Sequence, residues 1–277
     1  MPMSRNRVAP PQWREDINGW IDSLRVAGLS PETVKTRRNK MMHVADCMPA
    51  GPDEVTDDML VTWMASQRWK PETRKGYRNT VRSFFGWMHA TGRRADDPSR
   101  SLPKVKRPKP HPHPCPDRVI LSALGKATER EVMMLRLAAE CGLRRAEIAR
   151  VHSDDVMHDL VGWSLIVHGK GDKQRIVPIA DDLAGRIMDC HGWMLPGRWS
   201  GHVEESYVGK RLARLLGEPW TAHSLRHRYA TRTYAQTHDL LLVSQLLGHA
   251  SVETTQVYVA LPEDRMRAAL DAVRLVG

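Results

Sequence analysis

The chain has 277 residues and a formal net charge of +10 at pH 7, from 42 basic and 32 acidic side chains. This length allows one large or two ordinary domains with hydrophobic cores, and the charge indicates a polyanionic partner. The four cysteines form no C-x-x-C pair, which disfavours a disulfide scaffold. The sequence contains no signal peptide or long apolar run, so we expect a reduced cytoplasmic protein without a membrane partner.

The charge is distributed unevenly along the chain. Residues 1–110 hold 21 Lys and Arg against 12 Asp and Glu, whereas residues 111–277 hold 21 against 20. A broad excess of cations is typical of a surface that grips phosphates. Cations at particular positions in a balanced segment are more typical of an active site. We therefore expect the first part to bind a polyanion and the second to carry the chemistry.

Residues 1–12 are polar and basic, and we expect them to be flexible. After them, apolar residues recur at helical spacing in four stretches, with N-cap and proline signals at their starts and glycine at two of their ends. These stretches begin at Trp13, Ser30, Val55 and Lys70. The pattern predicts a compact four-helix domain over residues 13–95.

The segments PETVKTRRNK (31–40) and PETRKGYRNT (71–80) resemble each other. Each places several basic side chains on the first turns of a predicted helix. A solvated basic face would explain either segment alone, but the repetition in a basic domain favours contact with the DNA backbone. The predicted DNA-binding residues are Lys35, Arg37, Arg38, Lys40, Arg74, Lys75, Arg78 and Arg82.

Residues 96–116 are rich in proline and in basic side chains, which predicts an extended, semi-rigid linker. A metal site at His111, His113 and Cys115 is disfavoured, because every second residue is proline and no second pair of ligands follows. We predict neither a metal ion nor a cofactor. The second domain is expected to cover residues 117–262.

Two motifs open the second domain. In CGLRRAEIARV, a helix with a glycine near its end is followed by Arg144 and Glu147. WSLIVHGKGDKQRIVPIA predicts two strands, 163–168 and 174–179, around a turn that carries Lys170. Taken alone, Arg144 could satisfy helix carbonyls and Lys170 could be a solvated turn lysine. Lys173 and Arg175 are expected to contact backbone or solvent.

The stretch from 223 to 258 combines three kinds of side chain that suit phosphoryl transfer. HSLRHRYAT places His223 and Arg226 one helical turn apart, LLGH places His249 after a glycine, and Tyr258 follows. Cations hold a phosphate and a hydroxyl can attack it. Each residue also has an ordinary structural explanation, as a cap or a core aromatic.

In the order G-L-R, G-K-G, H-x-x-R-H, L-L-G-H and Tyr, these motifs resemble the tyrosine recombinases of the phage integrase family. The resemblance implies a mainly α protein with a small antiparallel sheet (α+β), in which a SAM-like four-helix core-binding domain precedes the catalytic domain. It also implies that the second and fourth helices enter the DNA major groove. One departure is Ala146, where the G-L-R-x-S-E box has serine.

The resemblance assigns roles to the candidate residues. Two arginines hold the scissile phosphate, a histidine adds a donor, Tyr258 attacks and Lys170 protonates the departing 5′-oxygen. The Glu147 carboxylate supports the site from behind. The product is a 3′-phosphotyrosyl bond, made without metal or ATP. The implied catalytic residues are Arg144, Lys170, His223, Arg226, His249 and Tyr258.

We therefore expect a site-specific recombinase that acts as a homo-tetramer on double-stranded DNA sites, associated with the nucleoid when bound. Phage or mobile-element integration and excision is the leading interpretation. A first helix at Trp13 leaves no room for an arm-binding domain, which leaves a reduced phage or mobile-element integrase or a Xer-like resolvase. A Xer-like resolvase, a type IB topoisomerase and a catalytically dead DNA-binding protein remain alternatives. An accessory DNA-bending protein is a further candidate partner. The pattern of residues 263–277 predicts a short tail helix. It would dock either on a neighbouring subunit or on its own domain.

Overall fold

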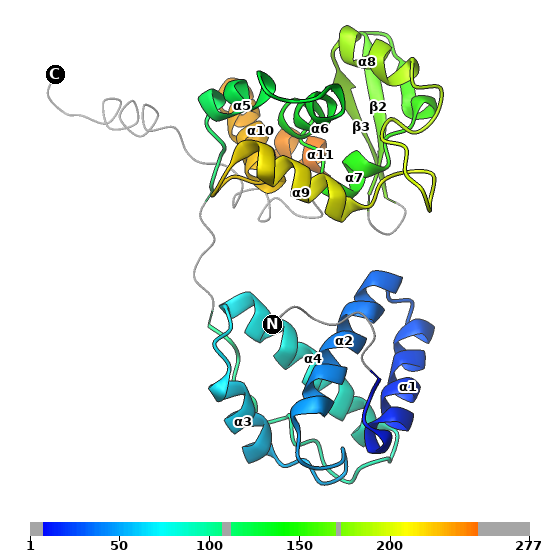
Figure 1. Cartoon of the computed structure of the whole chain (residues 1–277), viewed down its shortest axis with the longest axis vertical. Helices are drawn as coiled ribbons and strands as arrows, with labels where there is room; N and C mark the ends of the chain where they lie inside the picture. Colours follow the sequence, from blue (N-terminus) through cyan, green and yellow to red (C-terminus); the bar gives the residue numbers. More distant parts are fainter. Residues whose placement is uncertain (1–7, 107–111, 170–172, 249–277) are drawn as a thin grey trace, which may run out of the picture. The chain divides into compact units, whose positions relative to one another are not determined.

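The computed structural model describes residues 8–106, 112–169 and 173–248, and the chain divides into two compact units, Met1–Lys109 and Pro110–Gly277 (Figure 1). The described residues form many helices and one three-stranded antiparallel sheet. The expected fold class is therefore confirmed. Within the described part of the chain, no helix has the length and apolar character needed to span a bilayer.

Four helices build the described part of the first unit. Proline occupies the first position of three of them, where its missing N–H costs no helical hydrogen bond. The third begins after Thr56, whose hydroxyl accepts from the backbone N–H of Met59 at 3.2 Å. The helices are α1 (Pro11–Val26), α2 (Pro31–Cys47), α3 (Asp57–Ser66) and α4 (Pro71–Ala90).

The core of the first unit is aromatic. Phe84 of α4 packs against two tryptophans of α1, with ring centroids 5.8 Å from Trp13 and 5.5 Å from Trp20. All three side chains are fully buried. Leu102 lies in the segment predicted as linker, yet it is only 4% exposed and joins the same core. The chain therefore stays packed on this unit beyond the end of α4.

Most helices of the second unit contribute to a hydrophobic core that they share with one face of the sheet, and a smaller separate cluster of Ala230, Val243 and Leu247 joins its last two described helices. The longest described helix of this unit carries the H-x-x-R-H motif and packs against the helix Glu129–Ala139. The helices are α5 (Asp117–Leu124), α6 (Glu129–Ala139), α7 (Arg145–Ala149), α8 (Asp181–Met188), α9 (Glu205–Leu216), α10 (Ala222–Thr237) and α11 (Leu240–Leu247), with a 3-10 turn, η1, at Ser153–Asp155.

The sheet has the strand order β1-β2-β3, and both pairs are antiparallel. Strands β2 (Trp163–His168) and β3 (Gln174–Ile179) have the predicted bounds, whereas β1 (Val156–His158) was not predicted. A three-residue strand is too short to display an alternating pattern. The N–H of Gly169 donates to the Lys173 carbonyl at 2.7 Å and closes the hairpin loop.

Candidate active site

The G-L-R motif forms the corner between α6 and α7. Gly142 has φ +64°, and a Cβ at this position would lie 2.5 Å from the ring of Tyr229. Both the backbone conformation and the close approach of α10 therefore require glycine here. The corner makes Arg144 the N-cap residue of α7, with its side chain exposed. Because α6 ends and α7 begins at this corner, the Arg144 side chain points out of the core.

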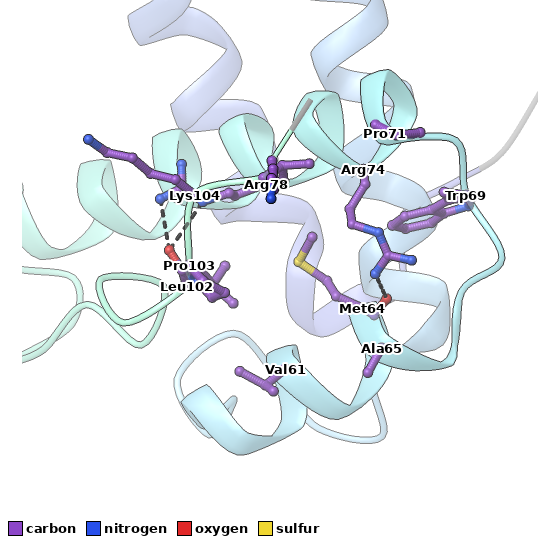
Figure 2. Close-up of a pocket in the computed structure, with 12 residues that line it drawn as sticks. Val61, Met64, Ala65, Trp69, Pro71, Arg74, Arg78, Leu102, Pro103 and Lys104 are labelled. Carbon is purple, nitrogen blue, oxygen red and sulfur yellow. Dashed lines mark hydrogen bonds between the residues drawn. The ribbon is translucent and has the colours of Figure 1, made fainter. Parts of the chain in front are cut away.

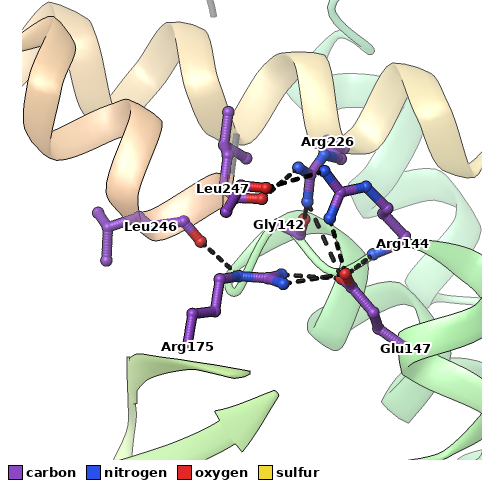
Figure 3. Close-up of polar contacts among 8 residues, drawn as sticks. Gly142, Arg144, Glu147, Arg175, Arg226, Leu246 and Leu247 are labelled. Atoms are coloured by element: carbon purple, nitrogen blue, oxygen red, sulfur yellow. Dashed lines mark hydrogen bonds and ion pairs between the residues drawn. The ribbon is translucent and has the colours of Figure 1, made fainter. Parts of the chain in front are cut away.

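Glu147 is a buried carboxylate that contacts three arginines (Figure 3). Arg144 donates to it from its backbone N–H at 2.7 Å and from Nη1 at 2.8 Å. Arg175 donates from both terminal nitrogens at 2.9 and 2.8 Å, and Nη1 of Arg226 lies 4.0 Å away. Burial acts to raise the pKa of Glu147, but the charge and hydrogen bonds of Arg175 and Arg144 outweigh it and lower the pKa to about 2. Glu147 is therefore ionised at neutral pH.

The same three guanidinium groups bind the C-terminal end of α11 (Figure 3). The carbonyl end of a helix is its negative end, so it attracts cations. The hydrogen bonds run from Arg175 to the Leu246 carbonyl at 2.8 Å, from Arg226 to Leu247 at 2.6 Å, and from Arg144 to Gly248 at 3.4 Å. The arginines thus fix the point at which the chain leaves α11.

Arg226 and His223 lie one turn apart near the start of α10. The Arg226 side chain is 1% exposed and also donates to the carbonyl of Gly142. His223 is exposed at the helix start. Loss of hydration around its ring, followed by the positive charges of Arg226, Arg145 and Arg144, lowers the pKa of His223. A neutral imidazole beside two arginines can accept a proton.

The structure therefore brings together Arg144, His223 and Arg226 from the predicted catalytic set. Lys170, His249 and Tyr258, like the tail 263–277, lie outside the described residues.

Arg175 was expected to contact backbone or solvent, and it does donate to the backbone carbonyl of Leu246, but sequence reasoning missed its second partner. It forms an ion pair with Glu147 at 2.8 Å. The signal was present in the strand alternation, because Arg175 shares a face of β3 with the buried residues Val177 and Ile179. Its position on the inward face indicated a partner inside the domain.

The basic residues of the first unit divide into two groups. Lys35, Arg38 and Arg82 are exposed on α2 and α4, and Lys75 is half-buried. Arg37 donates to the Ser83 hydroxyl at 3.2 Å. The Nζ of Lys40 lies 5.6 Å from the centre of the Tyr77 ring, and burial followed by the charge of Arg37 lowers the pKa of Lys40.

Arg74 and Arg78 face a groove of about 390 Å³ and bind backbone carbonyls there (Figure 2). Arg74 donates to Met64 at 2.7 Å and to Gln67 at 2.8 Å, at the C-terminal end of α3. Arg78 donates twice to the carbonyl of Leu102, at 3.1 and 2.7 Å. These two guanidinium groups connect α4 to its neighbours within the unit.

A sequence model described as the phage integrase family matches residues 118–265, which is more than half of the chain. The chain belongs to the phage integrase family. The predicted enzyme class, a tyrosine site-specific recombinase, is confirmed by this membership.

Relatives of this phage integrase family member extend over nearly its whole length. It is 28% identical over 286 residues to the tyrosine recombinase XerC of Chromobacterium violaceum, covering 93% of both chains. It is 28% identical to XerD of Pseudomonas putida, covering 91% of this chain and 94% of the relative.

Two solved structures share the fold. One is a lambda integrase dimer bound to a COC′ core site, with TM-score 0.72, 18% identity and coverage of 91% of this chain and 77% of that one. The other is the XerH recombinase in a post-cleavage complex with a palindromic difH substrate, with TM-score 0.69, 18% identity and coverage of 97% and 90%.

Proposed function

We propose that the protein cuts and rejoins double-stranded DNA at specific sites through a 3′-phosphotyrosyl bond to Tyr258. The observation that carries the proposal is the convergence of Arg144 and Arg226 on Glu147, beside the end of α11. His249 follows Gly248 directly in the chain. The two proposed phosphate ligands Arg144 and Arg226 are thus supplied by separate segments that meet at Glu147.

The charges at this point suit an anionic substrate. Three guanidinium groups surround a single carboxylate, so these four side chains together carry a formal charge of +2. Arg144 and Arg226 can donate parallel N–H bonds to the non-bridging oxygens of a phosphodiester. His249 adds a donor as negative charge develops in the transition state. Glu147 orients these guanidinium donors before the substrate binds.

Proton transfers complete the reaction. The Tyr258 hydroxyl attacks phosphorus and loses its proton to His223, which is neutral because its pKa is lowered. Lys170 protonates the departing 5′-oxygen. The P–O bond to that oxygen breaks as the bond to tyrosine forms, so the bond count is conserved. A 5′-hydroxyl of a second strand reverses the step and rejoins the DNA, and neither metal nor ATP is consumed.

We propose phage or mobile-element integration and excision as the biological reaction, carried out by a homo-tetramer on two duplexes. A lambda integrase tetramer bound to a Holliday junction shares the fold at TM-score 0.69 and 17% identity, which supports this assembly. The tail 263–277 is proposed to dock on a neighbouring subunit. The second candidate is a Xer-type resolvase, which is supported by the match to XerC over 93% of both chains.

The nucleophile is tested with a nicked suicide duplex that traps the covalent intermediate. Tyr258→Phe removes one hydroxyl, so we expect loss of the protein–DNA adduct with unchanged DNA affinity. Tyr207→Phe, at an exposed tyrosine of the same unit, is the matched control and should retain the adduct. An unchanged adduct yield in Tyr258→Phe would end this assignment.

A further inference from the structure

The segment that precedes α5 is hydrogen-bonded to α10. The backbone N–H of Cys115 donates to the Ser224 carbonyl at 3.0 Å, and that of His113 donates to Nδ1 of His227 at 3.2 Å. The ring of His113 also stacks on Trp220, with centroids 4.4 Å apart and planes at 13°. The end of the proline-rich stretch is therefore attached to the helix that carries the H-x-x-R-H motif.

Because of its composition, this segment uses all of its backbone N–H groups in the attachment. Residues 112–116 read Pro-His-Pro-Cys-Pro, and proline has no backbone N–H. The two N–H groups that the segment possesses are those of His113 and Cys115, and both donate to α10. Alternating prolines also keep the segment stiff, so a displacement at one end is carried to the other.

His227 is the side-chain half of this attachment. Its ring is 4% exposed, and Nδ1 accepts a hydrogen bond, which places the proton of the neutral ring on Nε2. Burial, followed by electrostatic repulsion from His223, His113 and Arg226, lowers the pKa of His227 to about 4. The acceptor is therefore available throughout the neutral pH range.

His227 also contacts the proposed catalytic residues. Its ring meets that of His223 edge-to-face, with centroids 4.6 Å apart and planes at 71°, and it directly follows Arg226 in the chain. We propose that His227 is a positioning residue that attaches residues 112–116 to α10 and holds the His223 ring. The placement of residues 112–116 is thereby coupled to the alignment of His223 and Arg226. This inference rests on the proposed function for the roles of His223 and Arg226.

The first test removes the acceptor. His227→Leu keeps a buried side chain but cannot accept from His113, whereas the amide oxygen of His227→Asn can replace Nδ1. We expect the leucine variant of the full chain to lose amide-exchange protection at His113 and Cys115. We also expect it to form the suicide-substrate adduct about tenfold more slowly, because small misplacements of catalytic groups are costly. DNA affinity should be unchanged, and the asparagine variant should restore both protection and rate.

The second test changes the donor, in a residue whose side chain is exposed and whose replacement leaves the core intact. His113→Pro and His113→Ala both remove the ring that stacks on Trp220, but the proline variant alone also removes the N–H. We expect His113→Pro to slow adduct formation more than His113→Ala does. Equal rates for the two would overturn the proposal.

The proposed function and the positioning role of His227 are overturned by different outcomes. A wild-type chain that forms no adduct would overturn the proposed function, and this coupling with it. A normal wild-type adduct, together with full-speed cleavage by a His227→Leu variant whose segment 112–116 has lost protection, would overturn the positioning role alone. Slow cleavage in both the leucine and asparagine variants would also count against it, since asparagine supplies the acceptor.

Discussion

A single buried carboxylate, Glu147, sets the directions of three guanidinium groups. Its side chain is 3% exposed and its pKa is lowered to about 2, against an ordinary value of 4.5. The arginines that surround it would otherwise repel one another. The carboxylate therefore contributes to folding and to the geometry of the phosphate site at once.

This pKa shift predicts a pH dependence of stability. Because the pKa is lower in the folded protein, Glu147 stabilises the fold above pH 4.5, and that contribution is lost as the pH falls towards 2. A shift of this size corresponds to about 3 kcal/mol. We expect the free energy of unfolding by urea, measured from pH 6 to pH 3, to decline less in Glu147→Gln than in the wild type. Glu129→Gln, at an exposed carboxylate of α6, should decline like the wild type.

His227 predicts a second, separate pH window. Its pKa is about 4 in the folded protein, against 6.5 ordinarily, so below pH 6.5 the unfolded chain binds a proton that the folded chain does not. Stability should therefore fall between pH 6.5 and 4. We expect His227→Asn to lose less stability than the wild type across this window in urea titrations. Parallel curves for the two proteins would contradict the assignment.

At the scale of elements, strand β3 holds helix α11 in place through one side chain. Arg175 binds Glu147 from α7 and the carbonyl of Leu246 at the end of α11. Gly248 has φ +62°, and a Cβ there would lie 2.9 Å from Cδ of Arg175. The end of α11 therefore lies directly against the arginine side chain. The position where the chain leaves α11 depends on this contact.

Removing the Arg175 side chain should therefore damage both stability and chemistry. Arg175→Ala leaves Glu147 with one partner fewer and frees the Leu246 carbonyl, at a cost of roughly 3–5 kcal/mol for breaking a buried ion pair. We expect a lower midpoint in urea and adduct formation at least about tenfold slower. Lys173→Ala, at an exposed residue of the same hairpin, is the control. Wild-type behaviour of Arg175→Ala would show that α11 is held by other contacts.

At the scale of the whole molecule, the basic residues of the first unit are proposed to grip DNA while the second unit performs the reaction. The structure separates cations that are exposed, such as Lys35 and Arg38, from cations that bind carbonyls, such as Arg74 and Arg78. The first kind is available to bind phosphates. The second kind is already engaged within the unit.

This division predicts different consequences for the two groups. In the full chain, replacing Lys35 and Arg38 by alanine should reduce the slope of log affinity against log salt by roughly 0.9 for each phosphate that the variant no longer neutralises. Replacing Arg74 and Arg78 should instead lower the free energy of unfolding by about 1–3 kcal/mol, because buried carbonyls lose their donors. Salt titrations and urea unfolding of both variants measure the two effects. A larger change of salt slope in the second variant would reverse the assignment.

Local sequence determined the elements and the order of the motifs. Proline at helix starts, glycine at helix ends and the alternation of β2 and β3 act over a few residues, so they can be read without the fold. The same holds for the motif order that indicated a tyrosine recombinase. The three-residue strand β1 carried too little pattern, and α5 and α7 were not predicted either.

Only the tertiary structure decided which partner each charged side chain takes. Arg175 pairs with Glu147, Arg78 binds Leu102, and His227 accepts from His113, and in each case the partners are far apart in the sequence. A guanidinium or imidazole has the same local signature whether it faces solvent, DNA or a buried carbonyl. The choice among these depends on which segments packing brings within hydrogen-bonding distance, and that depends on the whole chain.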